Sequence, residues 1–372
     1  MNARHPWLAD RTEHFASSGI RRVFDLAAKL KDPINLSIGQ PDFDVPDAIR
    51  DAAADAIQAG KNGYSPTQGI APLRERLAEQ IRERHPDQDR DVFVCSGTSG
   101  GLVLAMLATV DPGDEVIFAD PYFVMYPALV AMCGGVPVPV DVGSDGRWNP
   151  ADVEAAVTSR TKAIVVNSPS NPSGQVMSPE DAARIADVAR RHDVLLISDE
   201  IYSRFVYDGP FDSMANRHDR CLVVDGFSKS HAMTGWRVGW VHGPKEVVSA
   251  MLKIQQYSFV CSPQPAQWGG LAAMDVDLSA HIDDYRHKRD RIVDGIGDMY
   301  DVAAPGGAFY AFPRLPAGIG GDEFVKRAVD RNLLVIPGHI FSRHDTHFRL
   351  SFAASDETLD RGIDVLRELA DG

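Results

Sequence analysis

Lys229 and Arg237 lie eight residues apart in the segment FSKSHAMTGWRVGW, residues 227–240. Lys229 follows the apolar run CLVVD and is flanked by serines, so its amine is expected to be poorly solvated. Burial lowers the pKa of a lysine, and the neutral amine can attack a carbonyl to form a Schiff base. Arg237 adds a permanent positive charge to the same Gly/Trp-rich segment. The segment therefore predicts covalent carbonyl chemistry beside an anion site.

Four other apolar runs that are typical of β-strands are followed by residues capable of binding a ligand. In open α/β sheets, ligands bind beyond the carboxyl ends of the strands. The residues in question are Gly97, Thr98 and Ser99 after VFVC (92–95), Phe123 after EVIFA (115–119), Asn171 after AIVVN (163–167), and Asp199 with Tyr202 after VLLIS (194–198). Taken singly, turn geometry explains the glycine-rich segment and Asn171, and aromatic packing explains Phe123.

Taken together, these strand ends match the requirements of one cofactor. The glycine-rich turn SGTSGG precedes an apolar helical run, and a helix N-terminus suits a phosphate group. Asp199 follows a strand apolar enough to be buried, where a carboxylate requires a cationic partner. A lysine for an aldehyde, a carboxylate for a pyridinium nitrogen, an aromatic ring and an arginine for a phosphate are what pyridoxal 5'-phosphate (PLP) requires. We therefore predict that the chain binds PLP.

Short apolar runs alternate with amphipathic helical patterns over most of the chain. This alternation predicts an α/β fold whose largely parallel sheet is covered on both faces. Further expected elements are the strands CLVVD (221–225) and WRVGWV (236–241), and the helix PEDAARIADVARRHD (179–193) with Ser178 as its N-cap. From about Pro265 the rhythm changes to long helices with the runs FYAF (309–312), LLVI (333–336) and FRLSF (348–352). We expect a second, smaller α/β layer here, joined by the N-terminal segment.

Composition narrows the class of protein. The chain has 372 residues, 44% of them apolar, and its first thirty residues lack the apolar region and cleavage site of a secretory signal. No stretch approaches eighteen uncharged apolar residues, so no membrane span is expected. Cys95, Cys133, Cys221 and Cys261 lack CxxC spacing, which predicts reduced thiols in the cytoplasm and no metal site. A net charge of −14 without a basic cluster argues against nucleic acid as a partner.

Eight segments together resemble the successive sequence blocks of the class I and II aminotransferases, which are PLP-dependent enzymes of fold type I. The segments are GQPDFDVP (39–46), YSPTQG (64–69), DPGDEVIFADPYFVMYP (111–127), VVNSPSNPSG (165–174), SDEIY (198–202), FSKSHAMTGWRVG (227–239), PGGAFYAFP (305–313) and FRLSFA (348–353). They occur in the family's order across nearly the whole chain, and they are similar to those of aspartate and aromatic aminotransferases.

The resemblance implies a fold with two domains. The large domain has a mostly parallel seven-stranded sheet between helices, and both termini build a smaller α/β domain. In this sequence we assign residues 1–44 to the small domain, 45–265 to the large PLP-binding domain and 266–372 to the small C-terminal domain.

The resemblance also implies roles around the cofactor ring. Lys229 would form the internal aldimine and then move a proton between Cα of the substrate and C4′ of the cofactor. Asp199 would pair with the pyridinium nitrogen, Tyr202 and Asn171 would bond the ring hydroxyl, and Phe123 would stack on the ring.

Further residues would hold the phosphate and the substrate. The phosphate ligands implied by the resemblance are Gly97, Thr98, Ser99, Ser228, Arg237 and, from the partner subunit, Tyr64. Arg349 would bind the substrate α-carboxylate, with Asn171 and the backbone of Gly39 beside it. Since Tyr64 would reach a neighbouring site, we expect a homodimer with shared active sites.

The substrate is less sharply defined than the cofactor. Relatives that prefer dicarboxylic substrates add a second cation, and the turn SGTSGG contains none, although Arg21 or Arg22 can supply one if that segment closes over the site. We expect a neutral, aromatic or aspartate-like L-amino acid as donor and 2-oxoglutarate as acceptor. The alternative is a fold-type I PLP lyase that catalyses β-elimination, because it shares the lysine, aspartate and arginine.

Overall fold

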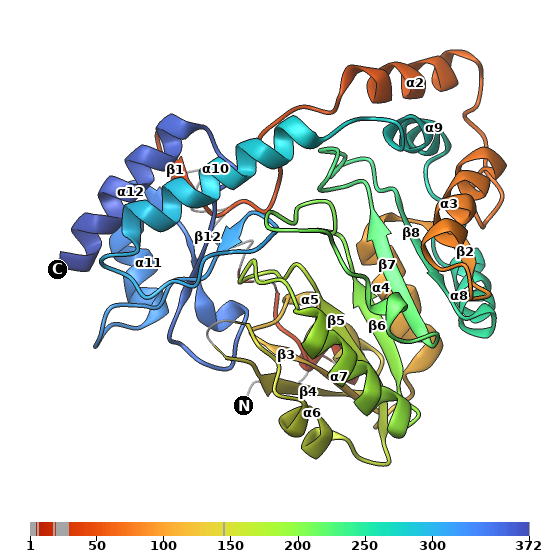
Figure 1. Ribbon diagram of the computed structural model, residues 1–372, viewed down its shortest axis with the longest axis horizontal. Coiled ribbons are helices and arrows are strands. Elements are labelled where there is room, and N and C mark those ends of the chain that lie inside the picture. Colours follow the sequence, from red (N-terminus) through yellow and green to blue (C-terminus); the bar gives the residue numbers. More distant parts are fainter. Residues whose placement is uncertain (1–4, 6, 18, 20–29, 144–145, 372) are drawn as a thin grey trace.

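A seven-stranded sheet forms the centre of the larger part of the molecule in the computed structural model, which describes residues 5, 7–17, 19, 30–143 and 146–371 (Figure 1). Its strands, in spatial order, are β2 (Asp91–Cys95), β8 (Gly239–Gly243), β7 (Cys221–Gly226), β6 (Leu195–Asp199), β5 (Thr161–Asn167), β3 (Glu115–Asp120) and β4 (Val136–Asp141). All neighbours are parallel except β8, which is antiparallel to both β2 and β7. The predicted α/β fold with a mostly parallel sheet is confirmed.

Helices cover both faces of this sheet, and each face has its own hydrophobic cluster. One face packs against α4 (Gly97–Thr109), α5 (Met125–Met132) and α8 (Lys245–Tyr257), and the other against α6 (Pro150–Ala156) and α7 (Pro179–Arg191). The predicted N-cap of α7 is present, since the Ser178 hydroxyl accepts a hydrogen bond from the Asp181 amide. Burial on both faces explains why the central strands are continuously apolar.

A third group of helices packs at the β2 end of the sheet. It comprises α2 (Asp47–Gln58), α3 (Ala71–Arg84) and α9 (Gln264–Ala273), and its cluster includes Phe227 and Val238 on either side of the lysine segment. No helix in the described ranges combines the length and apolar character of a membrane span.

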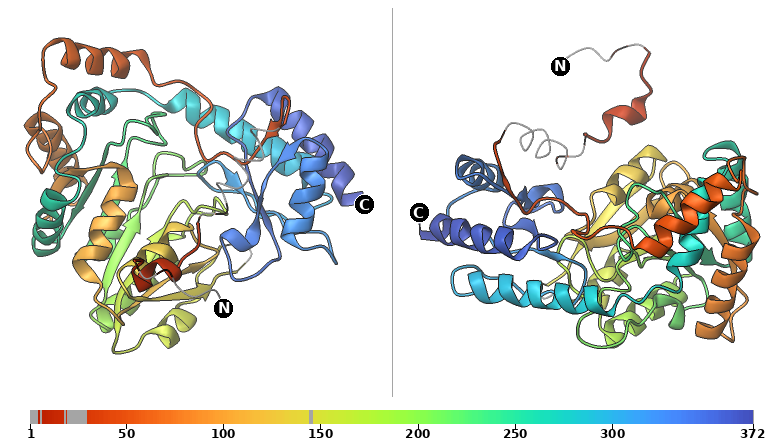
Figure 2. Two further views of the ribbon diagram at one scale, coloured as in Figure 1. Left: turned by 180° about the vertical axis from the view of Figure 1, so that it is seen from behind. Right: turned by 90° about the horizontal axis from the view of Figure 1, so that it is seen from above.

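The smaller part of the molecule contains the C-terminal elements and the chain segment around residues 34–35 (Figure 2). Its three-stranded antiparallel sheet has the order β11 (Ile336–Pro337), β12 (Phe348–Ser351), β9 (Tyr310–Ala311), and β1 (Ile34–Asn35) pairs in parallel with β10 (Leu333–Leu334). Its helices are α10 (Ser279–Ile296), α11 (Gly321–Asp330) and α12 (Asp356–Asp371). Three short 3₁₀ helices complete the described elements: η1 (Asp10–Glu13), η2 (Met214–Asn216) and η3 (Gly338–Ile340).

The domain boundaries that we assigned stay predictions. Pairing of β1 with β10 agrees with the expected participation of the N-terminal segment in the smaller part. Residue 265 lies within α9, which packs with α2 and α3, so a boundary after α9 follows the packing better.

Two strands differ from the sequence-based expectation. β8 begins at Gly239 rather than at residue 236, because Arg237 adopts a positive φ of 56° in the turn that precedes the strand. β4 was not predicted, since its sequence VPVPVD contains two prolines. It lies at the edge of the sheet, where a missing N–H is tolerated.

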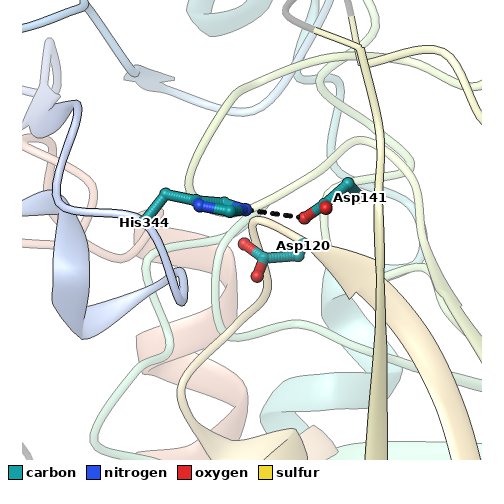
Figure 3. A group of neighbouring side chains, drawn as sticks. All are labelled: Asp120, Asp141 and His344. Atoms are coloured by element: carbon teal, nitrogen blue, oxygen red, sulfur yellow. Dashed lines mark hydrogen bonds and ion pairs between the residues drawn. The ribbon is translucent and has the colours of Figure 1, made fainter.

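A group of charged side chains joins the smaller part to the β3–β4 edge of the large sheet. Asp120 and Asp141 end the two strands, and His344 approaches them from the loop after η3 (Figure 3). Arg343, the residue before it, belongs to the same group. Arg343 donates from Nε to Asp120 Oδ2 at 2.9 Å and from its second guanidinium nitrogen to Asp141 at 2.9 Å, and His344 lies 2.9 Å from the same Asp141 oxygen. The Asp120 side chain is fully buried, so Arg343 supplies the cation that this carboxylate requires.

We expect Arg343→Ala to lower the free energy of unfolding by about 1–3 kcal/mol, because it leaves the buried Asp120 carboxylate without its cation. Urea unfolding monitored by circular dichroism measures this loss. Arg184→Ala is the matched control, since it removes an exposed pair with Glu180 and should cost below about 0.5 kcal/mol. Equal losses in the two variants would contradict the role assigned to Arg343.

Candidate active site

The predicted site residues converge on a cavity of about 290 Å³ at the carboxyl ends of β5, β6 and β7. The residues on its wall that the sequence singled out are Gly39, Thr98, Ser99, Phe123, Asn171, Asp199, Tyr202, Ser228, Lys229, Arg237 and Arg349. They come from both parts of the molecule. Arg349 lies on β12 of the small sheet, Asp199 ends β6, and Thr98 and Ser99 lie in α4, while the others belong to loops and turns. Gly97 lies directly behind this wall, against Arg237.

One end of the cavity is suited to an anion. α4 begins at Gly97, and Thr98 and Ser99 in its first turn face the cavity with Arg237 and Ser228. Gly97 has a φ of +66°, and a Cβ at this position would lie 2.5 Å from an Arg237 guanidinium nitrogen, so the contact requires glycine. Arg237 also donates to the backbone oxygens of Thr234 and Ser96 at 3.1 and 3.3 Å.

The Lys229 amine lies in the middle of the cavity wall. It donates a hydrogen bond to the backbone oxygen of Gly39 at 2.5 Å. Burial, together with the positive charges of Arg349 and Arg237, lowers the pKa of Lys229 to about 8, against the opposing influence of Asp199. The amine therefore loses its proton around pH 8 rather than above pH 10, which is the direction that the sequence predicts.

Asp199 is buried, and burial raises its pKa to about 6. Its Oδ2 accepts a hydrogen bond from the Tyr126 hydroxyl at 2.8 Å, and its Oδ1 accepts one from the Ile201 amide at 3.4 Å. None of the hydrogen bonds to this carboxylate comes from a cationic side chain among the described residues, so the expected pairing with a pyridinium nitrogen stays a prediction. The carboxylate instead relies on a phenol and a backbone amide, with the Lys229 charge acting over a longer distance.

Tyr202 and Arg349 meet around a residue that the sequence argument did not single out. The hydroxyls of Tyr202 and Tyr310 lie 2.8 Å apart, and the guanidinium carbon of Arg349 lies 4.6 Å from the Tyr310 ring centre. The same guanidinium carbon lies 4.5 Å from the ring centre of Phe341. Arg349 is fully buried and donates to Asn171 Oδ1 at 3.0 Å and to the Ser37 backbone oxygen at 2.8 Å.

Three of the predicted residues require separate comment. Tyr64 is 86% exposed and lies outside this cavity, so its predicted role concerns a neighbouring subunit. Arg21 and Arg22 lie outside the described residues.

His231, two residues after Lys229, packs in the protein interior. It is buried, its Nδ1 lies 2.8 Å from the Ser230 hydroxyl, and its ring contacts Phe227 edge to face. Burial lowers its pKa to about 4, so the ring is neutral at physiological pH.

Tyr126, Asn167 and Tyr310 belong to the site but were not predicted individually. Asn167 ends β5, where its amide donates to the Asp199 backbone oxygen at 3.0 Å and its Oδ1 accepts from the Asn171 amide at 2.8 Å. All three occur in sequence blocks that resemble the family, in DPYFVMYP, VVNSPSNPSG and PGGAFYAFP. Their position inside these blocks was the feature of the sequence from which they could have been predicted as site residues.

With this geometry, the comparisons with known proteins identify the family. Residues 31–366 match the family described as aminotransferase class I and II, and the chain belongs to it. It is 37% identical to the putative aminotransferase YugH of Bacillus subtilis over 96% of each chain. It is 33% identical to aromatic-amino-acid aminotransferase 2 of Thermococcus litoralis, over 97% of this chain and 98% of the relative.

A solved structure agrees with this assignment. The aspartate aminotransferase from Thermus thermophilus with maleate has a TM-score of 0.93 and 35% identity, and the match covers 98% of this chain and all of the other. The protein is thus a PLP-dependent aminotransferase of fold type I.

The residues of the cavity fit PLP. The Ser228 hydroxyl is buried without a hydrogen-bond partner in the described chain, beside Arg237 and the N-terminus of α4. Such an unsatisfied donor is costly unless a ligand pairs with it, and a phosphate oxygen at a helix N-terminus does so. Arg349 Nε is likewise buried without a partner, which leaves a donor for a substrate carboxylate.

Lys229 is expected to react as an amine with a pKa near 8 rather than its ordinary 10.5. In protein freed of cofactor, the rate of labelling by an amine-reactive reagent should rise with pH to a midpoint of about 8, because only the neutral amine reacts. Mass spectrometry of the Lys229 peptide measures this rate. Arg349→Leu removes a repelling positive charge and should move the midpoint upward. A wild-type midpoint at the ordinary value would refute the lowered pKa.

Proposed function

We propose that this aminotransferase moves an amino group from a neutral or aromatic L-amino acid to 2-oxoglutarate through PLP bound covalently at Lys229. The convergence of Lys229, Asp199, Arg237 and Arg349 on one cavity carries the proposal. An amine, a buried carboxylate and two guanidinium groups match, in order, the aldehyde, the ring nitrogen, the phosphate and the substrate α-carboxylate.

PLP supplies an electron-withdrawing ring that stabilises negative charge on the substrate Cα. Lys229 would provide the nucleophile, since a pKa lowered to about 8 makes a much larger fraction of the amine neutral at physiological pH than an ordinary lysine has. The same amine, at the middle of the cavity wall, would also serve as the base that takes a proton from the substrate Cα. Asp199 lies where it can keep the ring nitrogen protonated, and Tyr126 holds its carboxylate in place by a 2.8 Å hydrogen bond.

Arg349 would orient the substrate through its α-carboxylate. Its guanidinium is held between aromatic contacts to Tyr310 and Phe341, and Nε remains available. A bidentate contact to a carboxylate in a buried site is strong and directional. This contact is common to all α-amino acids, so specificity depends on what surrounds the substrate side chain.

Charge in the cavity favours a neutral donor. Among the described residues that line it, the cations are Lys229, Arg237 and Arg349, each with a role toward the cofactor or the α-carboxylate. A side-chain carboxylate would therefore need a further cation, for which Arg21 and Arg22 are the candidates in the sequence. Relatives include an aromatic-amino-acid and an aspartate aminotransferase, so both donor classes occur in the family.

We also propose that the enzyme works as a homodimer in the cytoplasm. Tyr64 is 86% exposed and therefore free to contact another subunit, and it lies in the block YSPTQG that resembles the family's subunit-bridging segment. The four cysteines are free thiols, which suits a reducing compartment. Amino acids and 2-oxo acids are the partners that the activity requires.

Replacing Lys229 with alanine should lower turnover by at least about a thousandfold, because nucleophile and base are both lost. Cofactor affinity should persist in part, since the phosphate contacts remain. Borohydride reduction of the wild type should fix PLP to the Lys229 peptide, as read by mass spectrometry. Lys245→Ala, which removes an exposed lysine paired with Asp89, is the control. Full activity in Lys229→Ala would disprove the mechanism.

For the donor, we expect kcat/KM with an aromatic or neutral amino acid to be at least comparable with that for aspartate. An aromatic side chain gains from apolar burial, whereas the aspartate side chain needs a second cation. The measurement is the ratio of kcat/KM for the aromatic or neutral donor to kcat/KM for aspartate, in the wild type and in the Arg21→Ala, Arg22→Ala double variant. A hundredfold preference for aspartate, about 2.7 kcal/mol, would overturn the neutral-donor proposal. Loss of such a preference in the double variant would show that Arg21 or Arg22 binds the side-chain carboxylate.

The shared-site proposal predicts complementation between an inactive and an impaired chain. Tyr64→Phe should reduce kcat/KM by about tenfold through loss of a hydrogen bond to charged phosphate. Hybrids of Tyr64→Phe with Lys229→Ala chains should be more active than either parent, because one of their two sites regains both residues. Light scattering should give a dimer. An active monomer would rule out the shared site.

A further inference from the structure

Tyr310 connects the two ends of the active site. It lies on β9 opposite Ser351 of β12, the strand that carries Arg349, and its side chain is 1% exposed. Its hydroxyl lies 2.8 Å from that of Tyr202, at the end of the large sheet, and its ring lies 4.6 Å from the Arg349 guanidinium carbon. A Cβ on Gly39 would lie 2.4 Å from the Tyr310 hydroxyl, so the backbone that accepts from Lys229 packs directly on this phenol.

The charges around the two phenols indicate which one donates. Burial raises the pKa of Tyr310, but the Arg349 cation and the bond to Tyr202 oppose that effect. The pKa of Tyr202 is raised well above its ordinary value, first by burial and then by Tyr310. Either hydroxyl can donate across this 2.8 Å contact. Because the Arg349 cation lies against the Tyr310 ring and favours loss of its proton, we take Tyr310 as the donor to the Tyr202 oxygen. This leaves the Tyr202 proton free to point into the cavity.

We propose that Tyr310 is a positioning residue that sets the proton of Tyr202 toward the cofactor ring and fixes Arg349 at the substrate end. The inference rests on the function proposed above, in which Tyr202 bonds the hydroxyl on that ring. The Tyr310 hydroxyl acts on Tyr202, because a phenol that accepts one hydrogen bond donates another more strongly. The Tyr310 ring acts on Arg349 by a cation–π contact. One side chain from the small sheet thereby couples cofactor and carboxylate recognition.

The hydroxyl is tested by a pH titration of the visible absorption of the PLP-loaded enzyme. A donor beside the ring oxygen stabilises its anionic form, so loss of the donor raises the pH midpoint. We expect Tyr202→Phe to raise it by about one pH unit and Tyr310→Phe by about half a unit or more. The Tyr202→Phe, Tyr310→Phe double variant should match Tyr202→Phe alone, because Tyr310 acts only through Tyr202.

The ring is tested by the Michaelis constants. Tyr310→Phe keeps the ring and should leave KM for amino donors within about threefold, whereas Tyr310→Leu should raise it about tenfold for every donor. Tyr300→Phe is the control, since it removes another buried hydroxyl, one that donates to the Leu366 backbone oxygen at 2.7 Å. It should change thermal stability without moving the midpoint or KM. Thermal unfolding of each variant separates folding defects from these effects.

The outcomes separate the inference from the proposed function. A midpoint raised by Tyr202→Phe but unchanged by Tyr310→Phe overturns the role of Tyr310 alone. Additive shifts in the double variant do the same, because they require an action of Tyr310 that bypasses Tyr202. A wild type that binds no PLP, or a midpoint that Tyr202→Phe leaves unchanged, overturns the proposed roles of both residues.

Discussion

The positive charges of Lys229, Arg237 and Arg349 share one small cavity, and the rest of the site depends on how this repulsion is relieved. Desolvation and the two arginines together make the charged lysine unfavourable, so the amine releases its proton and becomes a nucleophile. The arginines cannot release theirs, and each must meet an anion or a carbonyl dipole. The same crowding that activates Lys229 thus creates two places where an anion is stabilising, one at the start of α4 and one beside β12.

The two arginines that form these anion sites are far apart in the sequence and belong to different sheets. Arg237 precedes β8 in the large sheet, while Arg349 lies within β12 of the small one. Their spacing therefore depends on the junction between the two parts. Arg343 ties the carboxylates that end β3 and β4 to the loop that leads into β12, and the Tyr122 amide donates to the Phe341 backbone oxygen at 2.7 Å in the same junction. An ion-pair group distant from the chemistry thereby helps to determine the distance between phosphate and carboxylate binding.

The sequence was most informative where a single strand determines a position. In a parallel sheet, residues just after each strand reach the same edge, so Asp199, Asn171 and Lys229 could be placed together from apolar runs alone. Contacts between the two sheets could not be derived in this way. The Tyr310 contact to Tyr202 depends on how β9 crosses the end of β6, and nothing in either segment's periodicity encodes that crossing. β4 was missed for a local reason, since its prolines suit only an edge strand and edge position is a property of the whole sheet.

Charge balance gives the reason why cofactor and substrate fit this cavity as a pair. Arg237 and the N-terminus of α4 can together offset most of a phosphate dianion, and Arg349 can offset one carboxylate. Asp199 requires a positive partner that its phenol and amide donors do not supply, and a protonated pyridine nitrogen is one. Lys229 aside, these pairings use every charged side chain on the described wall of the cavity. A second carboxylate on the substrate would stand outside this balance, which is why the donor side chain is the part of the reaction most sensitive to a cation supplied from elsewhere in the chain.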